Sequence, residues 1–510
     1  MAAVSAAALA TPLLLTASAT AAVAAPDPGK QGEVLAKRLV QKTSGQGAMK
    51  HLEAFQAIAD LHGGNRAAGT PGHEASAKYA GTLLEAAGYE VTYQNFDFVY
   101  RETLAEKLTV LTPERYDVPI TLMTYTTSTP EGGIEAAVAE VPVDADGTTG
   151  CTADDFASGD FTGKVALIQR GGCAFAEKQA AAADAGAVGA IIYNNVDGDL
   201  NGTLGDATAG RIPTGGISKE AGDALSARVA GGGVTVNLEI REYHDERTTP
   251  NVIAETRGGD PDNVVMLGAH LDSTADGPGI NDNASGSAGI LEAALQLAKA
   301  DKKGRHLNKV RFALWSAEEL GLQGSEYYVS NLSQAERDKI ALYLNFDMIA
   351  SPNYGLFVYD GDDSDGVGAG PGPEGSAQLE DAINRFIRSL GHEPRGTDFT
   401  GRSDYGPFIE VGIPSGGTFT GGDGTKTEEE VALWGGELGA AYDECYHQKC
   451  DDLSNINMTA FDINVDVIAN AVGTYAWDTS SLHQKVTAKS TKGTKGGGGG
   501  MHGHGHGATA

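Results

Sequence analysis

Two acidic residues, Glu318 and Glu319, stand side by side two residues after the apolar run "KVRFALW". Carboxylates in such a position can bind a metal ion or take part in proton transfer. They can equally open a helix, because acids in a first turn interact favourably with the positive end of the helix dipole. Taken alone, the pair favours a helix start, and residues elsewhere in the chain change that interpretation.

Two more polar residues end apolar runs of the same kind. His270 closes the run 263–270, and Asp347 closes the run 340–347. Individually, His270 could be a core histidine with satisfied hydrogen bonds, and Asp347 could be a helix cap. In open parallel sheets, however, the ligand crevice lies beyond the carboxyl ends of the strands. Polar residues that follow three successive strands are therefore predicted to converge on one site.

Three further candidates complete a metal-binding set. The Gly-rich stretch "HLDSTADGPGINDNASGS" carries Asp272 and Asp282, and His447 lies between two cysteines in "CYHQKC". Two histidines with three or more carboxylates fit a pair of zinc ions better than a structural zinc, which favours thiolates. Three ligand carboxylates and one hydroxide also balance the charge of two divalent cations. The sequence contains neither HExxH nor GxSxG, the motifs of two commoner hydrolase sites.

Hydrophobic periodicity predicts the elements that would position these residues. Helical patterns at 48–61 and 73–88 precede a strand-like run at 89–98, and the three apolar strands alternate with helical stretches such as 285–300. Strands that are apolar throughout predict a sheet that is covered on both faces. The expected fold class is α/β, with a mostly parallel central sheet flanked by helices.

Residues 114–244 differ in composition and are rich in Gly, Ala, Thr and Asp. Short strands and one Ala-rich helix, in "AFAEKQAAAADAG", predict a β-rich α/β domain inserted into a larger one. A chain of 510 residues with 41% hydrophobic content is long enough for two folded units and tails. We therefore expect the larger domain to comprise 49–113 and 245–482.

The two ends of the chain are expected to lie outside these domains. Residues 1–24 resemble a secretory signal, although a positively charged start is missing. A membrane anchor is the alternative, but this apolar stretch is too short to span convincingly and no later segment reaches that length. Residues 25–48 are expected to be an N-terminal segment or a propeptide, and 483–510 a disordered Gly/His-rich tail. Three histidines of the tail could bind metal adventitiously: His502, His504 and His506.

Charge and cysteine content limit the partners and the compartment. The net charge of −31 argues against nucleic acid, since phosphate binding depends on Lys and Arg. Export permits disulfides, and four cysteines allow three connectivities. We expect the pairing that is local in sequence, Cys151 with Cys173 and Cys445 with Cys450. The protein is thus expected to be a secreted monomer that binds neither nucleic acid nor a membrane.

Six stretches occur in the order "GAHLDS", "GINDNASG", "SAEELGLQGS", "LNFDMI", "GRSDYGPF" and "CYHQKC". In this series the chain resembles the secreted bacterial two-zinc aminopeptidases of the aminopeptidase S and aminopeptidase Y group, over about residues 49–480. The insertion, 114–244, resembles the protease-associated domain found in such enzymes. The resemblance implies a peptidase that removes the first residue of peptides and proteins with a free amino terminus.

The resemblance also implies a role for each candidate metal ligand. His270 and Asp347 would bind one zinc ion, and Glu319 and His447 would bind the other. Asp282 would bridge the two ions, and its peptide bond to Asn283 is often cis in these enzymes.

Four more residues receive roles from the resemblance. Asp272 would fix the ring of His270, and Glu318 would be the general base that takes a proton from water and passes it to the leaving amine. Tyr446 would donate a hydrogen bond to the oxyanion. Arg402 would help to hold the substrate, although it could instead form a salt bridge with Asp404.

Substrate preference and a further metal are implied in the same way. The apolar first pocket of the group is echoed by Met348, Gly401 and Phe419, which suggests large hydrophobic first residues such as Leu. Core packing explains Met348 and Phe419 equally well. Asp462 and Asp466 match a calcium site known in part of the group, and a solvated helix face is the alternative.

Two other classes of function stay open. A same-fold zinc enzyme, such as a carboxypeptidase or a glutaminyl cyclase, would need a cationic pocket for the substrate carboxylate or would work with one zinc ion. A non-catalytic binding protein would be expected to have lost ligands, whereas all five ligand positions are filled here.

Overall fold

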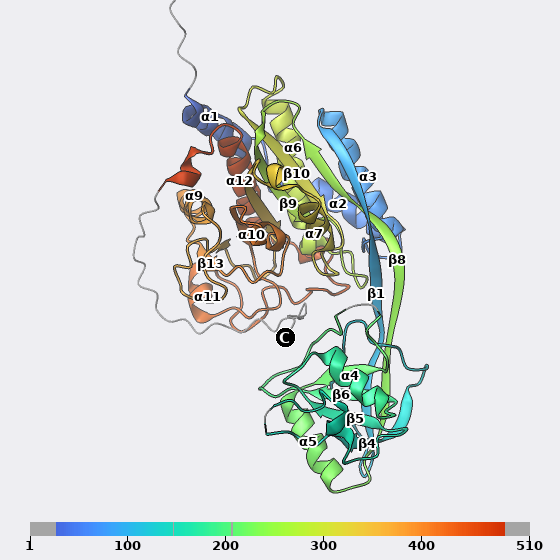
Figure 1. Ribbon diagram of the computed structural model, residues 1–510. Coiled ribbons are helices and arrows are strands. Elements are labelled where there is room, and N and C mark those ends of the chain that lie inside the picture. Colours follow the sequence, from blue (N-terminus) through green and yellow to red (C-terminus); the bar gives the residue numbers. More distant parts are fainter. Residues whose placement is uncertain (1–26, 146, 206–207, 485–510) are drawn as a thin grey trace, which may run out of the picture.

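The computed structural model describes residues 27–145, 147–205 and 208–484. The expected secretory signal and the histidines of the tail lie outside the described residues. Figure 1 shows a larger domain and a smaller inserted one, joined by two long strands.

One sheet of fourteen strands runs through the described residues in the order β13-β12-β14-β11-β9-β10-β8-β4-β5-β6-β7-β3, with β1 pairing to β8 and β2 to β1. The strands are β1 (Glu90–Thr112), β2 (Tyr116–Val118), β3 (Thr121–Leu122), β4 (Ile134–Glu140), β5 (Val165–Gln169), β6 (Gly189–Tyr193), β7 (Thr214–Ile217), β8 (Thr235–Glu255), β9 (Asp260–His270), β10 (Asn308–Trp315), β11 (Ile340–Asp347), β12 (Phe357–Tyr359), β13 (Arg395–Thr397) and β14 (Ser415–Phe419).

The three strands predicted to carry the site are neighbours. β9 pairs in parallel with β10 on one side and with β11 on the other. Successive side chains of a strand point to opposite faces, and in β9 both Leu267 and its neighbour Met266 are fully buried. Helices therefore have to cover both faces of the sheet, which confirms the predicted α/β class.

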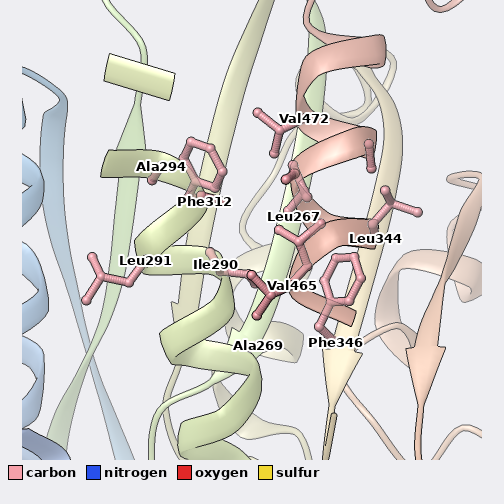
Figure 2. Packing of buried hydrophobic residues seen from close by; sticks show 14 of the residues in the cluster. Leu267, Ala269, Ile290, Leu291, Ala294, Phe312, Leu344, Phe346, Val465 and Val472 are labelled. Atoms are coloured by element: carbon pink, nitrogen blue, oxygen red, sulfur yellow. The ribbon is translucent and has the colours of Figure 1, made fainter. Parts of the chain in front are cut away.

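Helices α2, α3, α6, α9 and α12 supply the core on one face, where Leu267, Ile290 and Val465 pack together (Figure 2). The helices are α1 (Pro28–Val40), α2 (Gly45–Leu61), α3 (Pro71–Ala87), α4 (Phe175–Asp184), α5 (Lys219–Ala230), α6 (Gly286–Ala300), α7 (Gln323–Ser330), α8 (Gln334–Arg337), α9 (Ser376–Ser389), α10 (Gly406–Glu410), α11 (Glu428–Trp434) and α12 (Met458–Tyr475). Aromatic residues of α7 and α10 cover the other face, where Tyr343 stacks on Phe408.

Helix α3 illustrates how the sequence sets these elements. Thr70 caps its start by accepting a hydrogen bond from the backbone N–H of His73, and Pro71 occupies the first turn. Gly88 ends the helix in the left-handed region, at φ 100°. The helix predicted at 73–88 is thereby confirmed.

The segment 25–48 contains α1, and this helix packs against α12. Leu35 and Leu39 of α1 are buried in the core of the larger domain. Removal of the segment as a propeptide would uncover that core, and the propeptide stays a prediction.

Strands β1 and β8 pair along almost their whole length and extend through both domains (Figure 1). Phe96 and Tyr100 of β1 pack in the larger domain, whereas Leu108 and Val110 pack in the inserted one. The structure thus has no break at 244, which lies inside β8, and the core changes between Tyr100 and Leu108.

Both predicted disulfides are present, Cys151–Cys173 and Cys445–Cys450. Among the described residues, no helix has the length and apolar character needed to cross a membrane.

Candidate metal centre

The carboxyl ends of β9, β10 and β11 bring the predicted residues together. His270 is the last residue of β9 and Asp347 the last of β11, while Glu318 and Glu319 lie in the turn that follows β10. The alternative in which the two acids open a helix is wrong, because α7 begins only at Gln323. The helix-cap alternative for Asp347 is wrong as well, since a loop and then β12 follow it.

Asp282 lies between the two histidines. Its Oδ1 is 3.2 Å from Nε2 of His270, and its Oδ2 is 3.2 Å from Nε2 of His447. Asp347 Oδ1 is 3.4 Å from the His270 nitrogen, and Glu319 Oε2 is 3.0 Å from the His447 nitrogen. Each histidine therefore faces one oxygen of Asp282 and one further carboxylate, and the Asp282–Asn283 peptide is cis, as the resemblance implied.

Several of these atoms are buried and form no hydrogen bond. They are Nε2 of His270, Oε1 of Glu319 and Oδ1 of Asp347. A buried polar atom without a partner is costly, and buried carboxylates need cations nearby. His270 Nε2 and Asp347 Oδ1, for example, lie 3.4 Å apart but form no hydrogen bond. Atoms arranged in this way are typical of the ligands of one metal ion. The donor set, imidazole and carboxylate, fits zinc.

Glu318 also approaches this group. Its Oε2 lies 3.8 Å from the His270 nitrogen. Ligand atoms within 4.8 Å of one another form two sets, His270 with Asp282 and Glu319, and His270 with Glu318 and Asp347. The first set combines His270 and Glu319, which the resemblance assigns to different zinc ions, and the second set includes Glu318, the expected base. The sets overlap because all the atoms lie close together. The individual distances distinguish the two ligand pairs better.

Burial and neighbouring charges shift the pKa values of the site. Burial raises the pKa of Glu318 well above its ordinary value, and the carboxylates of Asp347, Asp404 and Glu319 raise it further, against the pull of His270. Burial also raises the pKa of Glu319, to about 7. Burial alone lowers the pKa of His447, but the carboxylates of Glu319 and Asp282 outweigh it and raise that pKa to about 11. The metal-free site therefore holds protons at neutral pH.

Three non-glycine residues of the site have a left-handed backbone. Ala317, Met348 and His447 have φ values of 57°, 47° and 56°. A left-handed backbone at a non-glycine residue costs about 1–3 kcal/mol and persists only where the surrounding structure fixes it. Two of them directly adjoin Glu318 and Asp347, so the backbone bends where these side chains turn into the crevice.

Asp272 is fully buried behind the site. Its carboxylate accepts hydrogen bonds from the backbone N–H groups of Glu318 (3.3 Å) and Glu319 (3.4 Å). His270 Nδ1 lies 3.2 Å from the backbone carbonyl of Asp272 and 3.7 Å from its carboxylate. The hydrogen bond of the His270 ring is thus to the backbone carbonyl of Asp272 rather than to the carboxylate that was expected to fix it. The carboxylate instead fixes the turn that carries the two glutamates.

A chain of buried hydrogen bonds that the sequence did not indicate leads to Asp347. Trp315 Nε1 donates to the Tyr343 hydroxyl (2.8 Å), which donates to Asn345 Oδ1 (2.9 Å). Asn345 Nδ2 donates to Ser403 Oγ (2.8 Å), and Ser403 donates to Asp347 Oδ2 (2.5 Å). Every donor points toward the carboxylate, so the chain fixes the orientation of Asp347 Oδ2.

Asp451 was also missed by the sequence analysis. Its carboxylate accepts hydrogen bonds from the backbone N–H groups of Asn281 (2.8 Å) and Asp282 (3.0 Å). It follows Cys450 directly, so it ties the disulfide loop that carries Tyr446 and His447 to the loop that carries Asp282. The sequence offers no signal for this contact except the position of Asp451 next to the cysteine.

A pocket opens beside the metal centre. Its lining includes Met348, Phe419, Arg402 and Tyr446, whereas Gly401 is not among the lining residues. Tyr446 stacks on the ring of His447, with 3.8 Å between the ring centroids. Several carboxylates line the same pocket: Asp282, Glu318, Glu319, Asp347, Asp398 and Asp423.

Asp404, the alternative partner of Arg402, is fully buried, and neither of its carboxylate oxygens forms a hydrogen bond. Burial raises its pKa to about 7.

Asp462 and Asp466 lie apart from the centre, on α12. Asp462 Oδ1 accepts a hydrogen bond from the backbone N–H of Gly45 (2.8 Å), and burial raises the pKa of Asp466 to about 6.

Comparisons with known proteins agree with this arrangement. The family model described as "Peptidase family M28" matches residues 251–472, and the model described as "PA domain" matches residues 135–225. An aminopeptidase of Pseudomonas aeruginosa is 44% identical over 459 residues, which cover 87% of this chain and 83% of that protein. Leucine aminopeptidase 2 of Trichophyton tonsurans is 43% identical over 431 residues, 84% of this chain and 83% of that protein.

A solved structure of a zinc aminopeptidase from Bacillus subtilis is 26% identical. It covers 84% of this chain and 94% of its own, with a TM-score of 0.55.

Proposed function

The chain belongs to peptidase family M28, and we propose on this premise that it is a secreted metallo-aminopeptidase that works with two zinc ions. The observation that carries the proposal is the position of Asp282, with one carboxylate oxygen 3.2 Å from each of two histidine nitrogens. The aminopeptidase names of its relatives, at 43–44% identity over most of both chains, support the same reaction.

The five ligand positions divide by distance. Asp347 lies next to His270 and Glu319 next to His447, with Asp282 between the pairs. When bound there, a pair of zinc ions would polarise the scissile carbonyl and make a water molecule acidic enough to attack near neutral pH. The zinc aminopeptidase of Bacillus subtilis supports zinc as the metal.

Glu318 is the general base in this proposal. Both histidines already face closer carboxylates, at 3.0–3.4 Å, whereas Glu318 lies 3.8 Å from His270. Its carboxylate can therefore accept a proton from the attacking water and pass it to the leaving amine. Asp272 assists by fixing the backbone of the turn, and Tyr446, which lines the pocket, would donate a hydrogen bond to the oxyanion.

The substrate is a peptide with a free amino terminus. A protonated amine is a cation. Three of the six carboxylates that line the pocket are assigned to zinc, and Glu318, Asp398 and Asp423 remain beside the basic residue Arg402. That charge favours an amino terminus over a substrate carboxylate, which a carboxypeptidase would have to bind. Met348 and Phe419 offer apolar surface for a large first residue such as Leu, in line with the leucine aminopeptidase of Trichophyton tonsurans.

The comparison of free and amino-blocked substrates tests this proposal. Leucine anilide should be cleaved, whereas N-acetyl-leucine anilide should not. No residue should be removed from the carboxyl end of a peptide. Equal cleavage of the free and the acetylated anilide would contradict recognition of the amino terminus. A glutaminyl cyclase would instead convert an N-terminal glutamine peptide with one zinc per chain, and a binding protein would turn over none of these substrates.

Secretion is part of the proposal, supported by two disulfides, which form in oxidising compartments. We add no calcium ion: the contact of Asp462 with Gly45 gives that carboxylate a structural role, so calcium at Asp462 and Asp466 stays a prediction.

A further inference from the structure

Arg66 is a fully buried arginine that lies behind the metal centre. It precedes α3, more than 200 residues before Asp282 in the chain. A buried guanidinium is rare and needs partners for its five N–H donors. Its partners therefore indicate what holds it there.

Within the part of the chain that the structure describes, the side chain of Arg66 donates hydrogen bonds to three carbonyls of the loop that leads to Asp282. One terminal nitrogen donates to the carbonyl of Leu271, Nε donates to that of Pro278 (2.8 Å), and Nη2 donates to that of Gly279 (2.6 Å). Leu271 follows His270 directly, and Gly279 lies three residues before Asp282. The guanidinium thus joins the two ends of the loop 271–282.

Asp451 holds the end of the loop at Asn281 and Asp282, and Arg66 holds the carbonyls at Leu271, Pro278 and Gly279. The loop is rich in glycine, and Gly279 has φ 60°, a conformation that leaves no room for a side chain, because a Cβ atom would lie 2.3 Å from the carbonyl of Asp282 and 3.2 Å from Arg66. The backbone N–H of Arg66 also donates to Ser273 Oγ (2.9 Å), inside the same loop. Without Arg66, the buried carbonyls of Leu271 and Pro278 would lose a donor, which is costly, whereas Gly279 O would keep its hydrogen bond from the backbone N–H of Ala284 (3.1 Å).

Charge gives Arg66 a second effect on the centre. Burial lowers its pKa to about 10, and the carboxylates of Asp272, Asp451, Glu319 and Asp282 oppose that shift. Arg66 therefore stays cationic at neutral pH, next to the carboxylates of the site.

We propose that Arg66 is a positioning residue, which holds the loop 271–282 so that the carboxylate of Asp282 stays between His270 and His447 and can bridge two metal ions. The inference rests on the proposed zinc site. A planar fork of donors is required, because Arg66 reaches the three carbonyls from three different nitrogens, whereas the three donors of a lysine ammonium lie on one nitrogen.

Two substitutions at Arg66 and one control test this role. R66M removes the charge and the donors, and R66K keeps the charge but not the fork. R311M is the matched control, since Arg311 is a largely buried arginine of the same domain that bonds Glu255 (2.7 Å) and does not contact the loop. The measurements are the zinc dissociation constants by competition with a chromophoric chelator, kcat and KM for leucine anilide, and the melting temperature.

R66M should bind zinc about 10- to 100-fold more weakly, as is typical when a group that supports a metal ligand is lost. At saturating zinc its kcat should fall more than its KM changes, and R66K should lie between R66M and the parent. R311M should lower the melting temperature and leave zinc affinity and kcat at the parental level.

Parental zinc affinity and kcat in R66M, with only a lower melting temperature, would overturn the proposal and leave Arg66 a purely structural residue. If R66M does not fold, R66K decides, and parental zinc affinity in R66K overturns the proposal equally. A parent protein that binds no zinc would instead refute the proposed function, whatever the variants do.

Discussion

Glu318 and Glu319 are neighbours in the chain, yet their carboxylates have different surroundings. Oε2 of Glu319 lies 3.0 Å from the His447 nitrogen, whereas Oε2 of Glu318 keeps 3.8 Å from the His270 nitrogen. Ala317, with φ 57°, begins the bend that turns both side chains toward the crevice. The two residues therefore take different parts in one reaction, ligand and base.

The variants E318Q and E319Q separate these parts. E318Q keeps the size of the side chain but cannot accept a proton, so zinc content should stay at the parental level while turnover falls. Loss of a positioned general base costs about 10²- to 10⁴-fold in rate. E319Q should lose zinc as well as turnover, because a neutral amide is a poor zinc ligand.

Zinc content measured beside turnover distinguishes the two variants, since both should be slow. Loss of metal in E318Q with full metal in E319Q would reverse the assigned roles. Unchanged turnover in both variants would remove the acids from the mechanism.

Zinc binding should release protons, because the metal-free site holds them. The pKa of His447 is raised to about 11, and that of His270 is raised well above its ordinary value by Glu318 and Asp347 despite burial. Both rings are therefore protonated at pH 7 and have to become neutral to bind zinc. Affinity should fall as the pH is lowered, and protons should leave the site when zinc binds at pH 7.

Titration calorimetry in buffers of different ionisation enthalpy counts these protons. Zinc binding whose heat does not depend on the buffer would show that no proton leaves, against the account.

Among the site residues, the sequence indicated those that end strands and those that occur in spaced motifs. His270, Asp347 and the two glutamates could be predicted because strand ends share one edge of the sheet. Arg66, Ser403 and Asp451 could not, because their hydrogen bonds to backbone or to distant side chains leave no periodic pattern. Their partners lie 56 to 213 residues away.

Elements fix these side chains by joining segments that are distant in sequence. The disulfide Cys445–Cys450 closes a short loop that holds Tyr446 and His447, and Asp451 then ties this loop to the backbone of Asp282. The disulfide Cys151–Cys173 lies in the inserted domain, away from the centre. The two bonds provide a test and a control.

Replacement of Cys445 and Cys450 by serine should lower kcat for leucine anilide and weaken zinc binding, because His447 loses its restraint. Loss of this disulfide should lower the free energy of unfolding by only about 2 kcal/mol, because the loop that it closes is so short. Replacement of Cys151 and Cys173 should cost about 3 kcal/mol by the same reasoning and leave kcat unchanged. Kinetics and unfolding curves check both, and an unchanged kcat in the first variant would deny the loop its positioning role.

The strand β8 marks what sequence periodicity missed at the scale of elements. The change in composition suggested a boundary near residue 244, whereas the structure continues one strand from Thr235 to Glu255, through the polar stretch 241–248. Pairing with β1, for example Tyr100 with Asp245, keeps this polar stretch extended. Such long-range pairing cannot be recognised from local composition.

The molecule combines two domains on one sheet. The fold of the larger domain could be predicted, because its buried strands and amphipathic helices are plain in the sequence. The position of the inserted domain in space could not be predicted, since β1 and β8 carry it at a distance that their pairing sets. A hollow is lined by both domains, with Tyr125 and Thr203 on one side and Leu320 and Tyr327 on the other.

The register of β1 and β8 shows where the inserted domain can be removed. Glu102 pairs with Tyr243, so residues 103–242 can be replaced by an Asn-Gly turn, which suits a two-residue hairpin. The shortened protein should keep zinc binding and cleave leucine anilide at a rate close to that of the parent, because none of the site residues lies in that span. Cleavage of long peptides should change, since the hollow loses one side.

Zinc analysis and anilide kinetics on the soluble, folded variant check this expectation. A folded variant without zinc would make the inserted domain part of the catalytic core.

The central claim, two zinc ions bridged by Asp282, is tested most directly by metal content measured beside turnover. The parent protein, dialysed free of loose metal, should contain two zinc ions per chain and cleave leucine anilide. Chelation should remove both the metal and the activity, and added zinc should restore the activity as two ions rebind. Full turnover after verified removal of the metal would contradict the account.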